Sequence, residues 1–174
     1  MRTTDLKRFL AYAINLILIF AVAPAVGVML TPAAPAQADV RGTIWVDARV
    51  SGAWPIASAV RYVEPYTGTT MRLGPCHTGT KCIVIRERAS LPAAWGAVTY
   101  IGYPLTTIAL NPRRRGVSAA QRYHIVVHEL GHANGIMTHA RSCTSIMYYN
   151  VHCPSGQLAP MRFSAAELAT LRGN

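Results

Sequence analysis

The strongest chemical signal in the sequence is the pentapeptide His-Glu-Leu-Gly-His at residues 128–132. In a helix, His128 and His132 lie one turn apart on the same side, so both imidazoles can bind one metal ion. Glu129 projects about 100° away from His128, where its carboxylate can take a proton from a metal-activated water. The alternative is a pair of ordinary histidines on a helix surface. The pattern favours a zinc site (Zn2+) with Glu129 as the general base.

The residues around this motif resemble the signature of the metzincin clan of zinc metalloproteases. That signature reads H-E-x-x-H-x-x-G-x-x-(H/D), and Gly135 occupies its glycine position. A metzincin also has a methionine turn beneath the metal. The segment Ser-Ile-Met-Tyr-Tyr at residues 145–149 is similar to the corresponding turn of astacins. The resemblance implies a peptidase in which the metal activates water.

Within the clan, the chain looks most like the small secreted bacterial proteases of the snapalysin type. Cys143 and Cys153 lie on either side of Met147, as in those proteins, and the short chain fits as well. The resemblance covers about residues 54–171. Only the block at residues 128–153 carries specific motifs.

The third zinc ligand is the point at which the sequence departs from the family pattern. The signature places it at position 138, where Thr138 is a poor ligand beside imidazole or carboxylate. His139 follows one residue later, and one added loop residue still allows its imidazole to reach the metal. We expect His139 to complete the set with His128 and His132. Two alternatives stay open: a carboxylate from elsewhere, such as Glu167 in the manner of gluzincins, or a degenerate site.

Five further side chains have expected roles. The resemblance implies that Tyr149 reaches the zinc or the oxyanion, the alternative being a buried aromatic residue under the site. Met147 is expected to pack below the ligands without binding the metal. His124 is expected to be an ordinary histidine near a helix start, although it is close enough in sequence to approach the cleft. His77 and His152 lie beside cysteines and are expected to face solvent.

The two motif histidines require a helix, and the sequence predicts one. Ser118 followed by Gln121 is typical of a capping box at a helix start. Gly135 is expected to mark the end, because glycine readily adopts the left-handed conformation that terminates helices. Apolar residues recur at helical spacing on the face expected to contact a sheet: Tyr123, Val126, Val127 and Leu130.

The remaining elements predict an α+β fold: a metzincin-like twisted mixed sheet packed on two long helices, with a C-terminal helix after the methionine turn. That last helix is expected to begin at Ser164, with Glu167 completing a capping box. Either of the last two strands is a candidate edge strand for a substrate backbone. The predicted strand, helix and four strands that precede the motif helix are residues 42–50, 54 to about 62–64, 69–73, 82–87, 96–101 and 106–110.

The first 38 residues are typical of an export signal. Basic residues precede an apolar run at residues 9–30, and the segment ends in Ala-Gln-Ala, a pattern that signal peptidase accepts. We expect cleavage after Ala38, which leaves a protease domain of residues 39–174. The alternative is an uncleaved membrane anchor through residues 9–30, because the run is long enough to span a bilayer.

All four cysteines lie in the part expected to be exported, where an oxidising environment favours disulfides. The simplest pairing joins neighbours in sequence, Cys76 with Cys82 and Cys143 with Cys153. A zinc site made of the four cysteines is the alternative. The sequence contains no C-x-x-C pair to support it.

The net charge of +10 suggests anionic partners, but the basic residues are scattered and form one run of three, at residues 113–115. No nucleotide-binding glycine motif is present. We therefore expect a secreted, monomeric zinc endopeptidase that acts on proteins or peptides, without specific nucleic-acid binding or stable membrane association after signal cleavage. The alternative function is a secreted, non-catalytic basic binding module on a degenerate metzincin scaffold.

Overall fold

The structure, a computed structural model, describes residues 42–173. The predicted export signal and the alternative membrane anchor therefore lie outside the described residues. Within residues 42–173, no helix combines the length and the apolar character needed to cross a membrane. The elements follow the predicted order: β1 (Thr43–Arg49), α2 (Ile56–Thr67), β2 (Thr70–Leu73), β3 (Cys82–Glu87), β4 (Ala97–Tyr100), β5 (Leu105–Leu110), the 3-10 helix η1 (Pro112–Arg114), α3 (Ala119–Ala133) and α4 (Ala165–Gly173).

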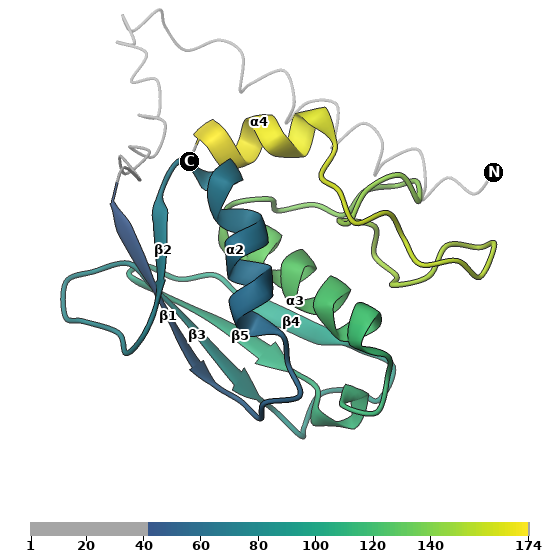
Figure 1. The fold of residues 1–174 in the computed structure, drawn as a ribbon, viewed down its shortest axis with the longest axis horizontal. Helices are drawn as coiled ribbons and strands as arrows, with labels where there is room; N and C mark the ends of the chain where they lie inside the picture. Colours follow the sequence, from purple (N-terminus) through teal and green to yellow (C-terminus); the bar gives the residue numbers. More distant parts are fainter. Residues whose placement is uncertain (1–41, 174) are drawn as a thin grey trace, which may run out of the picture. The chain divides into compact units, whose positions relative to one another are not determined.

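The five strands form one mixed sheet in the order β2-β1-β3-β5-β4. All neighbouring strands are parallel except β4, which pairs with β5 in the antiparallel direction. Helices α2 and α3 pack on each other and on the sheet, and α4 packs against α2 (Figure 1). The sheet is thus mixed, as predicted. Of the two candidate edge strands, β4 lies at the edge and β5 lies inside the sheet.

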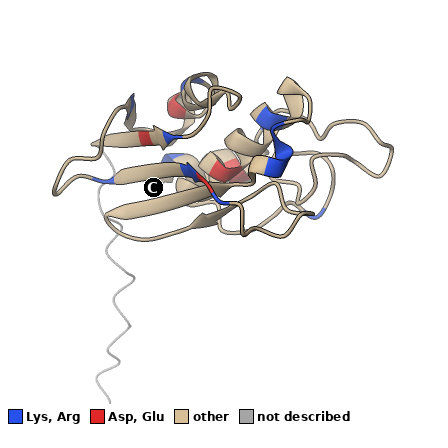
Figure 2. Cartoon of the chain, turned by 90° about the horizontal axis from the view of Figure 1, so that it is seen from below, with Lys and Arg blue, Asp and Glu red and all other residues tan. Residues whose placement is uncertain are grey.

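The charged residues do not gather on one element. Lysine and arginine residues occur on strands, on η1 and in loops, with acidic residues between them (Figure 2). Arg113 and Arg114 lie in η1, and Arg115 is its C-terminal cap residue. This distribution agrees with the scatter of basic residues along the sequence.

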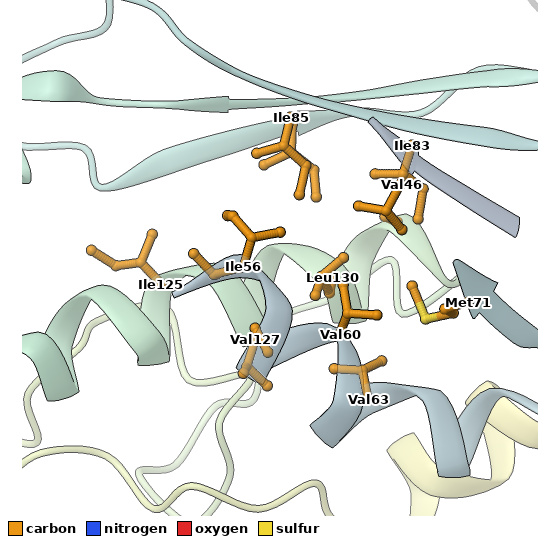
Figure 3. Close-up of a cluster of buried hydrophobic side chains, with 14 of the residues drawn as sticks. Val46, Ile56, Val60, Val63, Met71, Ile83, Ile85, Ile125, Val127 and Leu130 are labelled. Atoms are coloured by element: carbon orange, nitrogen blue, oxygen red, sulfur yellow. The ribbon is translucent and has the colours of Figure 1, made fainter. Parts of the chain in front are cut away.

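The hydrophobic core lies between the sheet and helices α2 and α3 (Figure 3). Alternate residues of the strands point to the helices because side chains in a strand change face at every residue. Ile83 and Ile85 of β3 are fully buried in this way, and so is Val46 of β1. The predicted apolar face of α3 is confirmed, with Val126, Val127 and Leu130 at 0% exposure and Tyr123 partly buried.

Helix α2 is longer than the sequence pattern indicates. The sequence pattern predicts an end near residues 62–64. Pro65 follows directly, and a proline has no N–H to donate and disfavours a helical conformation in the residue before it. The helix instead runs through Pro65 to Thr67. It ends where Gly68 adopts a left-handed conformation with φ of 66°. A glycine at the C-cap therefore determines the end of this helix, shortly after the proline.

Both predicted capping boxes are present. At the start of α3, the Ser118 hydroxyl accepts from the N–H of Gln121 (3.2 Å), and Gln121 Oε1 accepts from the N–H of Ser118 (2.8 Å). At the start of α4, Glu167 Oε2 and the N–H of Ser164 are 2.6 Å apart, and Ser164 Oγ accepts from the N–H of Glu167. These bonds satisfy N–H groups that have no partner within the helix.

The two disulfides have the predicted pairing. Cys76 is bonded to Cys82 at the start of β3, and Cys143 is bonded to Cys153 in the segment between α3 and α4. The described residues include no free cysteine. The alternative zinc site made of four cysteines is therefore wrong.

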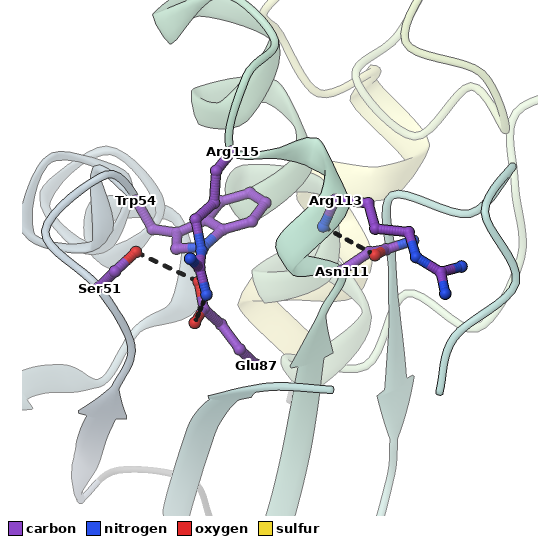
Figure 4. A network of polar contacts seen from close by, with 6 residues as sticks. All are labelled: Ser51, Trp54, Glu87, Asn111, Arg113 and Arg115. Carbon is purple, nitrogen blue, oxygen red and sulfur yellow. Dashed lines mark hydrogen bonds and ion pairs between the residues drawn. The ribbon is translucent and has the colours of Figure 1, made fainter. Parts of the chain in front are cut away.

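Glu87, at the end of β3, connects three parts of the fold (Figure 4). Its carboxylate accepts two hydrogen bonds from the Arg115 guanidinium (2.7 and 2.6 Å), one from the Trp54 indole (2.8 Å) and one from the Ser51 hydroxyl (3.2 Å). The Arg115 bonds are the main reason that the carboxyl pKa of Glu87 is lowered. The network joins the sheet to the segment before α2 and to the segment before α3.

We expect Glu87→Gln to lower the free energy of unfolding by about 1 kcal/mol at pH 7, because a charge-assisted pair is lost at a partly exposed site. The pKa of Glu87 is lower in the folded chain than its ordinary value of 4.5. The stabilisation is therefore present above about pH 4.5 and is lost as the pH falls through the folded pKa. Urea unfolding of both chains at pH 7 and pH 3 tests this, and an unchanged difference at pH 3 would contradict it.

Candidate metal centre

Three histidines come together at the C-terminal part of α3. His128 and His132 lie one turn apart in α3, and His139 follows from the loop after it. The Nε2 atoms of His128 and His132 are 3.1 Å apart, and those of His132 and His139 are 3.2 Å apart. Two nitrogens bound to one tetrahedral zinc ion, at about 2.0–2.1 Å each, would lie about 3.3 Å apart. The spacing therefore matches a set of three ligands for one metal ion.

The backbone determines which nitrogen of each α3 histidine is free. His128 Nδ1 is 2.8 Å from the carbonyl oxygen of Ile146, and His132 Nδ1 is 2.5 Å from that of Ile136. A carbonyl oxygen only accepts, so both Nδ1 atoms carry the proton and donate. In a neutral imidazole, both Nε2 atoms then present lone pairs. Two lone pairs at 3.1 Å repel each other, and a cation between them removes that repulsion.

The surroundings also keep these rings neutral. Burial lowers the pKa of His128 to about 3, against the opposing effect of its bond to Ile146. Burial lowers the pKa of His132 and of His139 as well. Only a neutral imidazole can bind a metal ion, so the three rings are in a ligating form at neutral pH.

His139 reaches the site because the loop after α3 is held at both ends. Gly135, with φ of 103°, turns the chain away from the helix, and the N–H of Ile136 bonds back to the carbonyl of Gly131 (3.1 Å). The N–H of Ala140 donates to the carbonyl of Met147 (2.8 Å). Thr138, where the family signature has its third ligand, is exposed. The additional loop residue therefore moves the ligand position by one.

The alternative acidic ligand, Glu167, has a structural role. Its carboxylate accepts hydrogen bonds from the Ser145 hydroxyl and from the N–H of Ser164. In the described part of the chain, the three histidines are the one group of three or more His, Cys, Asp or Glu residues placed to hold a metal.

Glu129 is buried beside the three histidines, with 6% of its surface exposed. Burial raises its pKa to about 7, while a hydrogen bond from the Thr99 hydroxyl to Oε2 (2.6 Å) acts in the opposite direction. Thr99 lies in the edge strand β4. Sequence reasoning did not identify Thr99, because no motif includes it and only the pairing of the sheet brings it to α3.

Met147 packs below the motif helix, as expected. It is fully buried, and a Cβ atom at Gly131 would lie 2.7 Å from its sulfur and 3.2 Å from Phe163. Gly131 lies between the two histidines of α3. The absence of a side chain at that position therefore allows the methionine turn to approach the helix closely, which brings the Ile146 carbonyl to His128.

A cavity of about 510 Å³ connects these residues. The three histidines and Glu129 line it together with β4, the loop at residues 94–96 and the segment at residues 148–151. Tyr149 also lines the cavity and is 67% exposed, so it is not the buried aromatic residue of the alternative expectation. Its neighbour Tyr148 also lines the cavity and is buried, at 6% exposure.

The other histidines differ in part from expectation. His124 is not an ordinary histidine at a helix start: it is 1% exposed, lines the cavity, and its ring lies 6.3 Å from the ring of His128. Segments from outside α3 cover this part of the helix, which the helical pattern could not indicate. His77 is exposed, as expected, whereas His152 is half-buried against Gln121.

The chain is similar to known proteins at the level of solved structures. No family model matches the chain, and no curated protein matches it. Among solved structures, the chain is similar to a crystal structure of myroilysin, with 14% sequence identity and a TM-score of 0.48 over 75% of this chain and 81% of the other. A second structure of myroilysin has 15% identity and a TM-score of 0.44, over 74% of this chain and 90% of the other. Similarity at this level does not establish a family.

We expect His139→Ala to weaken zinc binding at least about a hundredfold, because it removes one of three converging nitrogens. Thr138→Ala is the matched control, since it changes the neighbouring exposed side chain and should leave the affinity within about twofold. Competition with a chromogenic chelator measures both. Equal affinities for the two variants would rule out His139 as a ligand.

Gly131→Ala should lower the free energy of unfolding by about 1–2 kcal/mol, because the added methyl group contacts Met147 and overpacks the site. The control is Gly116→Ala at an exposed position, where an added Cβ atom would have no other atom within 4 Å. That change should alter stability by less than about 0.5 kcal/mol. Urea unfolding of the metal-free chains would disprove the packing argument if the two variants were equally stable.

Proposed function

We propose that this chain is a secreted, zinc-dependent endopeptidase with a metzincin-like site, most similar to the snapalysin type. The observation that carries the proposal is the convergence of three neutral imidazoles beside the buried carboxyl group of Glu129 in one open cavity. Three histidine ligands with room for a further ligand are typical of catalytic rather than structural zinc sites. His128, His132 and His139 would hold the ion.

When bound, zinc would supply Lewis acidity, which lowers the pKa of a water molecule toward about 7 and polarises a peptide carbonyl. Glu129 takes a proton from the attacking water and then gives it to the leaving amine. The hydroxyl of Thr99 holds Oε2 of the carboxylate, which leaves the other oxygen to exchange the proton.

Tyr149 has a supporting role in this proposal. It lines the cavity from the segment that follows Met147, and most of its side chain is exposed. Its hydroxyl would donate a hydrogen bond to the oxygen of the scissile carbonyl as negative charge develops there.

The substrate is an extended protein or peptide segment. Strand β4 pairs with β5 on one side only, and its residues Ala97, Val98 and Thr99 line the cavity. The N–H and C=O groups on its other edge can pair with a substrate backbone. Such pairing would place the peptide bond next to the histidines and Glu129.

Export follows from the N-terminal sequence and agrees with the two disulfides, which are typical of oxidising compartments. We propose cleavage after Ala38 and a monomeric mature domain of residues 39–174, without stable membrane association or specific nucleic-acid binding. The alternative function, a non-catalytic basic binding module, requires that the chain has lost the third metal ligand of the family pattern. The position of His139 and the scatter of basic residues (Figure 2) give that alternative no support.

The substitution Glu129→Gln tests the proposal. The zinc-loaded wild-type chain should cleave an unstructured protein such as casein, and the variant should lose at least about a hundredfold in kcat/KM, because it cannot accept the proton. Zinc content measured by mass spectrometry should stay at about one ion per chain, since no ligand is removed. Absence of cleavage by the zinc-loaded wild type, or equal cleavage by both chains, would contradict the proposal.

A further inference from the structure

One face of the sheet carries no helix of residues 42–173. Helices α2 and α3 pack on the other face and α4 packs against α2, so all three lie on one side of the sheet (Figure 1). Side chains that alternate with the buried Val46, Ile83 and Ile85 point away from the helices. We call the surface made by these alternating side chains the outer face. Its exposed residues include Arg49, Arg72, Arg86, Arg88, Tyr100 and Leu105.

Four arginines come together on the outer face, although they are spread along the sequence. Arg49 of β1 and Arg86 of β3 are partners in the pairing of the two strands. Arg88 follows directly after β3, where its guanidinium donates to the Tyr100 hydroxyl (3.0 Å) and lies 5.7 Å from the centre of that ring. Arg72 lies on the neighbouring strand β2. The strand pairing therefore creates a basic surface that no run of sequence indicates.

This surface has few negative charges. In the described part of the chain, Asp47 is the one acidic residue on the outer face, and it pairs with Arg49 (2.7 Å). The other acidic side chains of residues 42–173 accept hydrogen bonds elsewhere: Glu64, Glu87, Glu129 and Glu167. Within the same residues, the side chains of Arg72 and Arg86 have no hydrogen bond or ion pair. The outer face thus has a net positive charge and guanidinium groups that can bind a partner.

An apolar turn adjoins the outer face. Residues 100–105, Tyr-Ile-Gly-Tyr-Pro-Leu, connect β4 to β5, contain no charged residue and are all exposed, with Tyr103 at 79%. The N–H of Cys82 donates to the carbonyl of Pro104 (2.9 Å), which holds the turn at the start of β3. Of this turn, only Ile101 lines the cavity of the metal centre. Contiguous apolar residues at exposed positions are typical of an interaction site.

The basic and apolar parts are close enough to contact one partner. Arg72 pairs with Trp45, Trp45 with Cys82, and Cys82 with Leu105, so the four residues form one row across the sheet. Neighbouring strands are about 4.8 Å apart, which places Leu105 about 14 Å from Arg72 along this row. A partner with an extended surface can therefore cover the arginines and the apolar turn together.

We propose that the outer face and the apolar turn bind the surface of a membrane that contains anionic phospholipids. The inference goes beyond the proposed function and does not depend on it. Guanidinium groups bind phosphate oxygens in pairs, and lipid headgroups present such oxygens. Exposed tyrosine and leucine side chains can enter the boundary between headgroups and acyl chains. Such binding is reversible, and it therefore differs from a stable membrane association.

The apolar turn decides between anionic partners. A nucleic acid or another soluble polyanion would pair with the arginines, but it would leave the aliphatic side chains of Ile101 and Leu105 in water. A bilayer offers negative charge and an apolar layer next to each other, so it accounts for both parts of the surface. The positive charge of the outer face has the sign needed for an anionic leaflet.

Binding to lipid vesicles tests the inference. Protein recovered from the culture medium is sedimented with vesicles of phosphatidylcholine that contain about one third phosphatidylglycerol, and with vesicles of phosphatidylcholine alone. The anionic vesicles should bind at least about tenfold more tightly, and raising the salt from about 0.1 M to about 0.5 M should remove most of that difference. An uncleaved apolar anchor would insert into both kinds of vesicle and would give no such difference.

Substitutions on the two parts of the surface assign the binding. The double variant Arg72→Gln, Arg86→Gln should bind anionic vesicles about twentyfold more weakly, since each cation near the surface contributes about fivefold. Tyr103→Ser should weaken binding at least about fivefold, because it removes the most exposed apolar side chain of the turn. The control Arg113→Gln, Arg172→Gln removes the same charge at exposed sites outside the outer face and should stay within about twofold of the wild type.

Three results would overturn the inference. The first is equal binding of the wild-type chain to anionic and neutral vesicles. The second is an equal loss in the two double variants, which would show that net charge alone causes the binding. The third is no effect of Tyr103→Ser together with equally tight binding of a single-stranded oligonucleotide, which would assign the arginines to a soluble polyanion. Urea unfolding of each variant checks that the fold is retained, as expected for exposed positions.

Discussion

Two backbone carbonyls determine which ring nitrogen of His128 and of His132 is free to bind a metal ion. Those of Ile136 and Ile146 accept the Nδ1 protons of His132 and His128, so both Nε2 lone pairs point to one place. Neither carbonyl belongs to α3: one lies in the turn that ends the helix and the other in the methionine turn. A helix with the same motif but without these contacts would leave its imidazoles free to rotate and to change tautomer. The candidate metal site is thus formed jointly by a helix and the loops around it.

The same loops explain why α3 is buried on nearly all sides between His124 and Gly131. One face contacts the sheet through Val127 and Leu130, and the other is covered by the segment that contains Met147. Enclosure of this kind removes water from Glu129 and from the rings. This burial is the first cause of the lowered pKa of His128 and of the raised pKa of Glu129. Helix α3 therefore has buried residues on both faces: apolar side chains toward the sheet, and His124, His128 and Glu129 on the side of the cavity.

Sequence reasoning was most successful where the determining interactions are local. The helical spacing of His128 and His132, the capping boxes and the succession of strands and helices along the chain depend on neighbours within a few residues. It was wrong on the end of α2, because the helix continues through Pro65 to Thr67 and ends where Gly68 adopts a left-handed conformation. It also misjudged His124 and missed Thr99. Their roles come from segments distant in sequence that pack onto α3, and no local pattern records such contacts.

The Cys143–Cys153 crosslink closes a ten-residue span that includes the methionine turn. A newly made chain in a reducing environment lacks that closure, and the turn then has more conformational freedom to lose before its carbonyl can orient His128. Oxidation of this cysteine pair therefore favours the arrangement in which the Ile146 carbonyl orients His128 toward the other two imidazoles.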